Sequence, residues 1–192
     1  EKTVAFAMSS VAATLAKFSM DVCLYMSQNF DFISLPAHLT TGSSIMPHKK
    51  NPDVFELIRG KCNKIQALPY EITLITNNLP SGYHREFQLL KEGLFPAIQN
   101  LKACLDIAIF SIKDIKVKDN ILADPKYNYL FTVDTLNEMV VAGMPFRDAY
   151  KAVAEQLENG TYESPKATQH THEGSINNLC LKEIKEKMQN AF

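Results

Sequence analysis

The stretch "EKTVAFAMSSVAATLAKFSMDVCLYM", residues 1–26, has an apolar side chain at every third or fourth position. These side chains belong to Val4, Met8, Val11, Leu15, Phe18, Val22 and Met26. The spacing is the period of one helix face, so it predicts a long amphipathic helix. The pattern is already running at Glu1, and no capping residue precedes it. We therefore expect the chain to be the C-terminal portion of a longer polypeptide, with a processed N-terminus as the alternative.

Two further helices of similar length are expected, over residues 52–78 and 87–112, because apolar residues repeat there with the same period. Asn51 is expected to cap the first of them, with Pro52 at its first helical position. Pro69 should kink this helix, since proline lacks a backbone donor. Helices of about 25 residues are nearly 40 Å long, at about 1.5 Å per residue. Three of them predict a bundle of long helices.

Beyond residue 115 the segments are shorter. Residues 134–141, 145–159 and 176–188 predict three short helices, and no stretch alternates with the period of a strand. The sequence therefore predicts an all-α fold without a sheet. We expect two domains: residues 1–115 as the later part of a central helical bundle domain, and residues 116–192 as a small C-terminal helical domain.

Composition limits the possible functions. The 192 residues are 46% hydrophobic and 21% charged, with a net charge of −1, which is typical of a globular protein. Acidic and basic residues are interleaved, so no nucleic-acid partner is expected. The four cysteines have neither disulfide nor metal-ligand spacing, and predict reduced thiols in a cytoplasmic protein. We identify no signal peptide and no apolar run of membrane length, so no membrane partner is expected.

The most unusual segment is "TGSSIMPHKKNPD", residues 41–53, between two of the predicted helices. Gly42 permits backbone conformations closed to other residues, and Ser43 and Ser44 supply hydroxyl groups. Lys49 and Lys50 supply positive charge beside the N-terminus of the next helix. These features predict an anion-binding loop. The alternative is an ordinary polar connection with solvated lysines.

Within this loop, "GSSIMPHKKNP" resembles the signature of the fumarase/aspartase/argininosuccinate lyase superfamily, Gly-Ser-Ser-x-Met-Pro-x-Lys-x-Asn-Pro. The residues "KKNPD" look most like the argininosuccinate lyase family. Two further segments are similar to that family: "YHREFQLLK", residues 83–91, with its Tyr-x4-Gln-x2-Lys pattern, and "GMPFRDAYK", residues 143–151. The resemblance extends over about residues 1–160.

The resemblance implies a reversible β-elimination that splits argininosuccinate into arginine and fumarate, a step of arginine biosynthesis. It also implies a reaction without metal or organic cofactor, and a homotetramer whose active sites are shared between subunits. Such chemistry requires a base for a weakly acidic C–H group, a cationic cradle for the dianionic intermediate, and an acid for the leaving nitrogen.

Site residues follow from their positions in the motif. Ser43 is implied as the base, and Lys49 as the group that stabilises the intermediate. Ser44 and Asn51 are implied to bind substrate. Glu56 stands where the family has a carboxylate that orients a catalytic histidine, and that histidine belongs to a segment outside this chain. The alternative for Glu56 is a surface acid that pairs with a neighbouring basic residue.

Tyr83, Gln88 and Lys91 match family residues that bind the polar groups of the substrate. Their alternative roles are a turn anchor for Tyr83 and solvated side chains for the other two. His170 and His172 suggest a metal site, but alternate residues in a polar segment are poor ligand geometry, so no metal is expected. Two functional alternatives stay open: another lyase of the superfamily, similar to adenylosuccinate lyase, and a non-catalytic structural relative.

Overall fold

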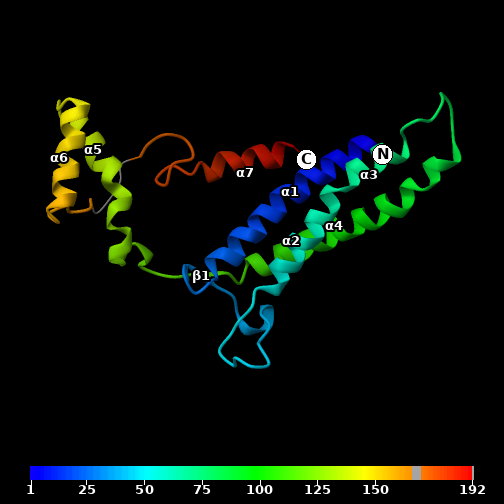
Figure 1. The fold of residues 1–192 in the computed structure, drawn as a ribbon, viewed down its shortest axis with the longest axis horizontal. Coiled ribbons are helices and arrows are strands. Elements are labelled where there is room, and N and C mark those ends of the chain that lie inside the picture. Colours follow the sequence, from blue (N-terminus) through cyan, green and yellow to red (C-terminus); the bar gives the residue numbers. More distant parts are fainter. Residues whose placement is uncertain (166–169, 192) are drawn as a thin grey trace. The chain divides into compact units, whose positions relative to one another are not determined.

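The computed structural model describes residues 1–165 and 170–191. The chain forms two compact units, Glu1–Asp119 and Asn120–Phe192. The first unit contains the two longest helices, and three helices of 10 to 13 residues lie in the described part of the second (Figure 1). Among the described residues the only strands are two residues long, so the prediction of an all-α fold is confirmed.

The first unit contains the helices α1 (Lys2–Tyr25), α2 (Asp53–Gln66), α3 (Leu68–Ile75) and α4 (Leu90–Ile112), and the short 3-10 helices Ala37–Leu39 and Arg85–Gln88. Strand β1 (Ile33–Ser34) pairs antiparallel with β2 (Lys116–Val117), with Ile33 opposite Val117. The sequence did not predict this ladder, because two residues are too few to show an alternating pattern. The chain runs along the bundle three times: α1, then α2 and α3 in the reverse direction, then α4 (Figure 1).

Prolines lie near the boundaries of α2 and α3, but the prediction that Pro52 is the first helical residue of α2 is wrong. The helix predicted over 52–78 is divided at Ala67, two residues before Pro69, into α2 and α3. The prediction that Asn51 caps α2 is wrong. The helix begins at Asp53 and Pro52 is its flanking residue, without a side-chain capping bond. The reason is that the backbone of Asn51 pairs with Thr41 instead.

The face that α1 buries matches the predicted one at Met8, Leu15 and Val22 and differs at other positions. Its buried residues are Ala5, Met8, Ala12, Leu15, Ala16, Ser19 and Val22. Val4 and Val11 were predicted on this face but are 49% and 44% exposed. Small residues at Ala5 and Ala12, both fully buried, let the backbones of packed helices approach closely.

A similar partial difference occurs in α4, which buries Leu90, Leu94, Ala97, Leu101, Cys104, Ala108 and Ser111. Leu105 and Ile109, which also repeat with the helical period in residues 87–112, are 36% and 58% exposed. The intramolecular face therefore takes in part of the apolar stripe together with small neighbouring residues. Other large side chains of the stripe remain uncovered within this chain.

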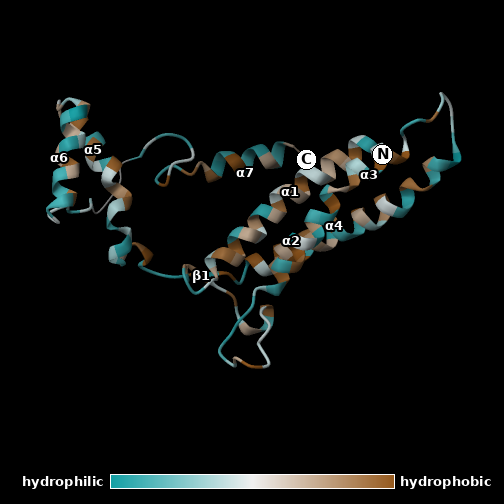
Figure 2. Ribbon diagram, viewed as in Figure 1, coloured by the Kyte–Doolittle hydropathy of each residue, from teal (hydrophilic) through white to brown (hydrophobic). Residues whose placement is uncertain are grey.

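Uncovered apolar side chains lie along both long helices of the first unit. Figure 2 shows hydrophobic and hydrophilic residues alternating along these helices. On α1 the uncovered apolar side chains include Phe6 and Met20, and on α4 Phe95 and Phe110. By length and mean hydropathy, α1 and the segment Arg85–Ile112 would each suffice to cross a membrane. The expectation that no segment of this kind exists is thus wrong. Core helices of bundles also pass this test, so it does not assign a membrane span.

The second unit contains α5 (Thr132–Val141), α6 (Phe146–Glu158) and α7 (Leu181–Asn190), after the 3-10 helices Ile121–Ala123 and Pro125–Phe131. Its buried core consists of Leu136, Ala149 and Val153. Gly143 ends the turn after α5 with φ of +103°, a conformation that favours glycine.

Phe55 is fully buried, and its ring packs edge-on against Phe18 with ring centroids 6.0 Å apart. Phe55→Ala should therefore lower the free energy of unfolding of the chain by about 3–5 kcal/mol, because it leaves a cavity. Leu57→Ala on the same helix is the matched control, since Leu57 is 63% exposed. Urea unfolding of both variants measures the difference. Equal losses would contradict the position of Phe55 in the core.

Candidate active site

The loop at residues 41–53 is closed at its base by main-chain hydrogen bonds. Thr41 N donates to Asn51 O at 3.2 Å, and Asn51 N donates to Thr41 O at 2.8 Å. The Thr41 hydroxyl donates to the Asp53 carboxylate at 2.5 Å. The Asn51 side-chain amide donates to Gly42 O at 3.4 Å. These bonds fix both ends of the loop at the start of α2, while most residues between them are exposed.

Ser43 has a defined environment within this loop. Its Oγ accepts hydrogen bonds from Ile45 N and Met46 N, both at 3.2 Å. Donors aimed at an oxygen favour its negatively charged form, as in an oxyanion hole. This geometry gives the Ser43 hydroxyl two hydrogen-bond donors from its own loop. Ser44 is exposed.

A cleft of about 600 Å³ lies between this loop, the start of α2 and the end of α1. Of the predicted site residues, Lys49, Asn51 and Glu56 line it, whereas Ser43 and Ser44 do not. His48 also lines the cleft, as does Gln28, which follows α1. Sequence reasoning missed Gln28 because no motif includes it.

Charges of both signs face this cleft. The ammonium groups of Lys49 and Lys50 form no ion pair with any residue that the structure describes. Glu56 lies in the first turn of α2, where the helix dipole favours a carboxylate. The alternative in which Glu56 pairs with Arg59 is not observed, since Arg59 Nη1 contacts Met20 Sδ at 2.9 Å. The two lysines are therefore available to an anion.

The thiols are not suited to nucleophilic chemistry. Cys23 lines the cleft, and burial raises the pKa of its thiol, a shift that Arg59 opposes and Glu56 reinforces. Burial also raises the pKa of Cys62 to about 12, with a further contribution from the neighbouring Cys104. A thiol with a raised pKa has little thiolate at neutral pH. We therefore do not assign Cys23 a role as a nucleophile in this cleft.

The other three predicted residues lie at the opposite end of the first unit, where α3 leads into α4 (Figure 1). Tyr83 is 72% exposed, and its hydroxyl accepts a bond from Gln88 Nε2 at 3.4 Å. Lys91 is exposed in the first turn of α4. The 23 residues of Asp53–Ile75 separate these residues from the loop, which is about 34 Å at the helical rise. One copy of this chain therefore does not bring the two groups together.

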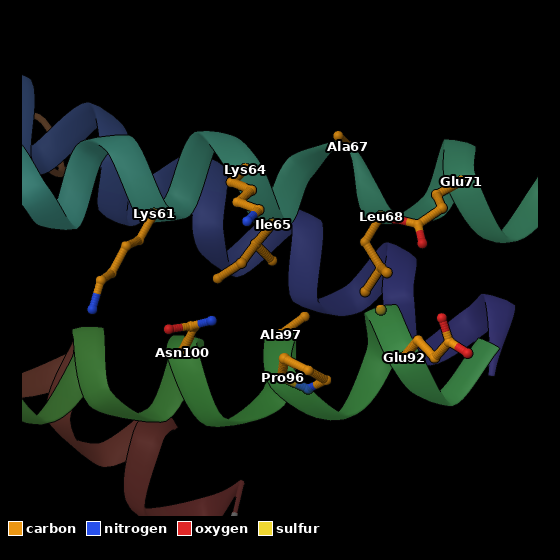
Figure 3. A pocket seen from close by; sticks show the side chains of 11 residues that line it. Lys61, Lys64, Ile65, Ala67, Leu68, Glu71, Glu92, Pro96, Ala97 and Asn100 are labelled. Atoms are coloured by element: carbon orange, nitrogen blue, oxygen red, sulfur yellow. The ribbon is translucent and has the colours of Figure 1, made fainter. Parts of the chain in front are cut away.

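A second cleft, of about 420 Å³, lies between α2, α3 and α4. Figure 3 shows Lys61 and Lys64 extending from α2 toward α4 at one end. Glu71 and Glu92 line the other end. Gly93 also lines this cleft. A Cβ on Gly93 would lie 2.8 Å from Glu71 Oε1, so α3 and α4 approach closely here. None of the predicted site residues lines this cleft.

In the second unit, His170 Nε2 and Asp134 Oδ1 are 2.5 Å apart, and the rings of His170 and His172 are 5.7 Å apart. Among the described residues no group of three or more histidine, cysteine or acidic side chains is arranged to hold a metal ion. In this geometry the His170 side chain is a hydrogen-bond partner of Asp134.

Comparison with known proteins gives consistent matches. A family model described as Lyase matches residues 3–67. The chain is 56% identical over 192 residues to argininosuccinate lyase of Parabacteroides distasonis, a match that covers 100% of this chain and 43% of the relative. It is 53% identical over 189 residues to argininosuccinate lyase of Bacteroides thetaiotaomicron, which covers 98% of this chain and 42% of the relative.

Among solved structures, the class II fumarase of Schistosoma mansoni superimposes with a TM-score of 0.69 at 21% identity. That match covers 83% of this chain and 33% of the fumarase. At this identity the likeness concerns the fold. The chain thus spans less than half the length of these relatives.

Proposed function

We propose that this chain, which belongs to the argininosuccinate lyase family, is part of a cytoplasmic enzyme that splits argininosuccinate into arginine and fumarate in arginine biosynthesis. The reaction is a reversible β-elimination, and we propose that it needs no metal or organic cofactor. The first unit is then a portion of a larger helical bundle domain, and the second unit is a small helical domain.

The observation that carries this proposal is the environment of Ser43. A serine acts as a base only where its alkoxide is stabilised. Two backbone N–H groups point at the Ser43 Oγ, and Lys49 belongs to the same loop. Ser43 then removes the proton beside the carboxylate that takes up the developing charge. The C–N bond breaks in the following step, as the leaving guanidino nitrogen takes up a proton from an acid outside this chain.

Lys49 and Asn51 serve the anionic intermediate. Both line the 600 Å³ cleft, and Lys49 has no competing ion pair among the described residues. Lys49 offsets the second negative charge of the intermediate, Asn51 donates to a carboxylate, and Ser44 contacts the substrate. Glu56 lines the same cleft and orients a histidine from a segment outside this chain.

Tyr83, Gln88 and Lys91 bind the polar groups of the substrate in a site completed by another subunit. The separation of about 34 Å from the loop supports this arrangement, because one copy cannot join the two groups. The uncovered apolar faces of α1 and α4 support burial between subunits. We propose a homotetramer, the assembly that the family resemblance implies.

The test is a substrate assay on the whole protein. Fumarate absorbance should rise when argininosuccinate is added, and the rate should be unchanged by a chelator. Adenylosuccinate is the matched control substrate and should give less than about a hundredth of that rate, since its leaving group lacks a guanidinium. Preference for adenylosuccinate would favour the sister lyase, and no turnover of either would favour the structural relative.

A further inference from the structure

We propose that Lys118 raises the affinity of the cleft of about 600 Å³ for its anionic substrate by neutralising Asp31, a carboxylate in the wall of that cleft. This rests on the proposed function, since it takes the ligand of the cleft to carry carboxylates. Lys118 is then a positioning residue that acts through Asp31 and does not itself touch the substrate. Both residues belong to the first unit.

The charged side chains that line the cleft balance one another. Lys49 and Lys50 contribute two positive charges. Asp31 and Glu56 contribute two negative charges. With His48 neutral, the formal charge of the residues that the structure places around the cleft is therefore zero. A lining of this kind attracts a substrate with several carboxylates only weakly, and a free carboxylate in the wall repels it.

Lys118 changes this balance from outside the lining. Its Nζ lies 2.5 Å from Asp31 Oδ2, so the two charges form an ion pair. Once Asp31 is neutralised, the remaining charges of the lining sum to +1. The side chains of Lys118 and Asp31 are 57% and 61% exposed, and solvent screens an exposed pair. We therefore expect an effect of a few-fold on substrate affinity.

The backbone around the pair holds its two side chains near each other. The strands β1 and β2 are paired, with Ile33 opposite Val117. Beside this ladder, Lys118 N donates to Phe32 O at 2.8 Å. Asp31 has φ of +48°, a left-handed conformation that is uncommon for residues other than glycine. Because the main chain already places Lys118 next to Asp31, the pair loses less side-chain entropy than two unconstrained surface residues would.

Steady-state kinetics of charge variants of the whole protein test the proposal. Lys118→Ala frees the Asp31 carboxylate, so KM for argininosuccinate should rise about threefold while kcat changes by less than about 1.5-fold. Lys118→Arg retains the positive charge and should keep the original KM. Lys116→Ala is the matched control, since Lys116 is an exposed lysine on β2 without an ion pair among the described residues. It should also keep the original KM.

The double variant Asp31→Asn/Lys118→Ala separates the effect of charge from that of structure. It lacks both charges of the pair and leaves the lining at +1, so KM should return to within about 1.5-fold of the original value. If Lys118 only tethered the wall of the cleft, the raised KM would persist, because the tether is broken in the double variant too. The rise for Lys118→Ala should also shrink at high ionic strength, which screens exposed charges. An unchanged KM for Lys118→Ala, or a double variant no better than the single one, would overturn the proposal.

Calorimetric titration with succinate provides a readout that does not need turnover. Succinate carries two carboxylates and no group that can be eliminated, so its Kd should follow the same order among the variants as KM. Absence of turnover in the unmodified protein would contradict the proposed function. Equal succinate Kd values for the unmodified protein and Lys118→Ala would contradict the role of Lys118, and so would an unmodified protein that binds no succinate.

Discussion

Ser43→Ala in the whole enzyme is expected to lower kcat by about a thousandfold, because the variant lacks the group that removes the proton. The substrate Kd should change by less than about threefold, since Lys49, Asn51 and the remaining binding groups stay in place. The two N–H groups of Ile45 and Met46 would lose their acceptor, which disturbs the loop only locally. Steady-state kinetics together with calorimetric titration of argininosuccinate separate the two effects.

Ser44→Ala is the matched control for this experiment. Ser44 is the adjacent serine, and the chemical change is identical. Because we assign Ser44 to substrate binding, its replacement should raise KM with a much smaller change in kcat. A Ser43→Ala enzyme that keeps more than a tenth of the original kcat would make Ser43 a bystander. A reversed pattern would assign the base to Ser44.

The second large effect concerns the 192-residue chain by itself, which is expected to show no turnover of argininosuccinate above background. The reason is geometric: the loop residues and the group around Tyr83 lie about 34 Å apart within one copy. Glu56 also has no histidine from outside the chain to orient. Catalytic groups must be placed to within fractions of an ångström to act together.

Fumarate absorbance on adding argininosuccinate to the purified chain measures this effect. Coexpression with the remaining portion of the enzyme should restore turnover. The matched control is the same coexpression with Ser43→Ala in this chain, which should restore assembly but not activity. Turnover by the unaccompanied chain at the rate of the whole enzyme would contradict the proposed sharing of the site.

The helix boundaries show where sequence reasoning succeeds. Proline and glycine act on the backbone of their own neighbourhood, so Pro69 and Gly143 mark a helix break and a turn whatever the chain packs against. The capping role predicted for Asn51 fails for a related reason. Its backbone bonds go to Thr41, ten residues away, and local propensity does not include such a partner.

The loop motif shows the same difference between what local sequence indicates and what the fold decides. The sequence identified Lys49, Asn51 and Glu56, and the structure places all three around one cleft. The sequence did not reveal that Gln28 joins them, because that contact depends on where α1 ends relative to the loop. It also did not reveal that Tyr83 and Gln88 lie at the far end of the bundle. A motif identifies which residue types are present and at what spacing in the sequence. The distances between them in space depend on how the chain folds.

The sequence by itself determined the all-α class, the approximate helices and the residues of the loop, because these depend on local periodicity and on side-chain chemistry. Only the tertiary structure decided which residues of each helix are inside. It buries Ala5 and Ala12 where the apolar pattern favoured Val4 and Val11. Hydrophobicity ranks side chains by the area they can remove from water, whereas two helices in close contact select side chains small enough to fit between them.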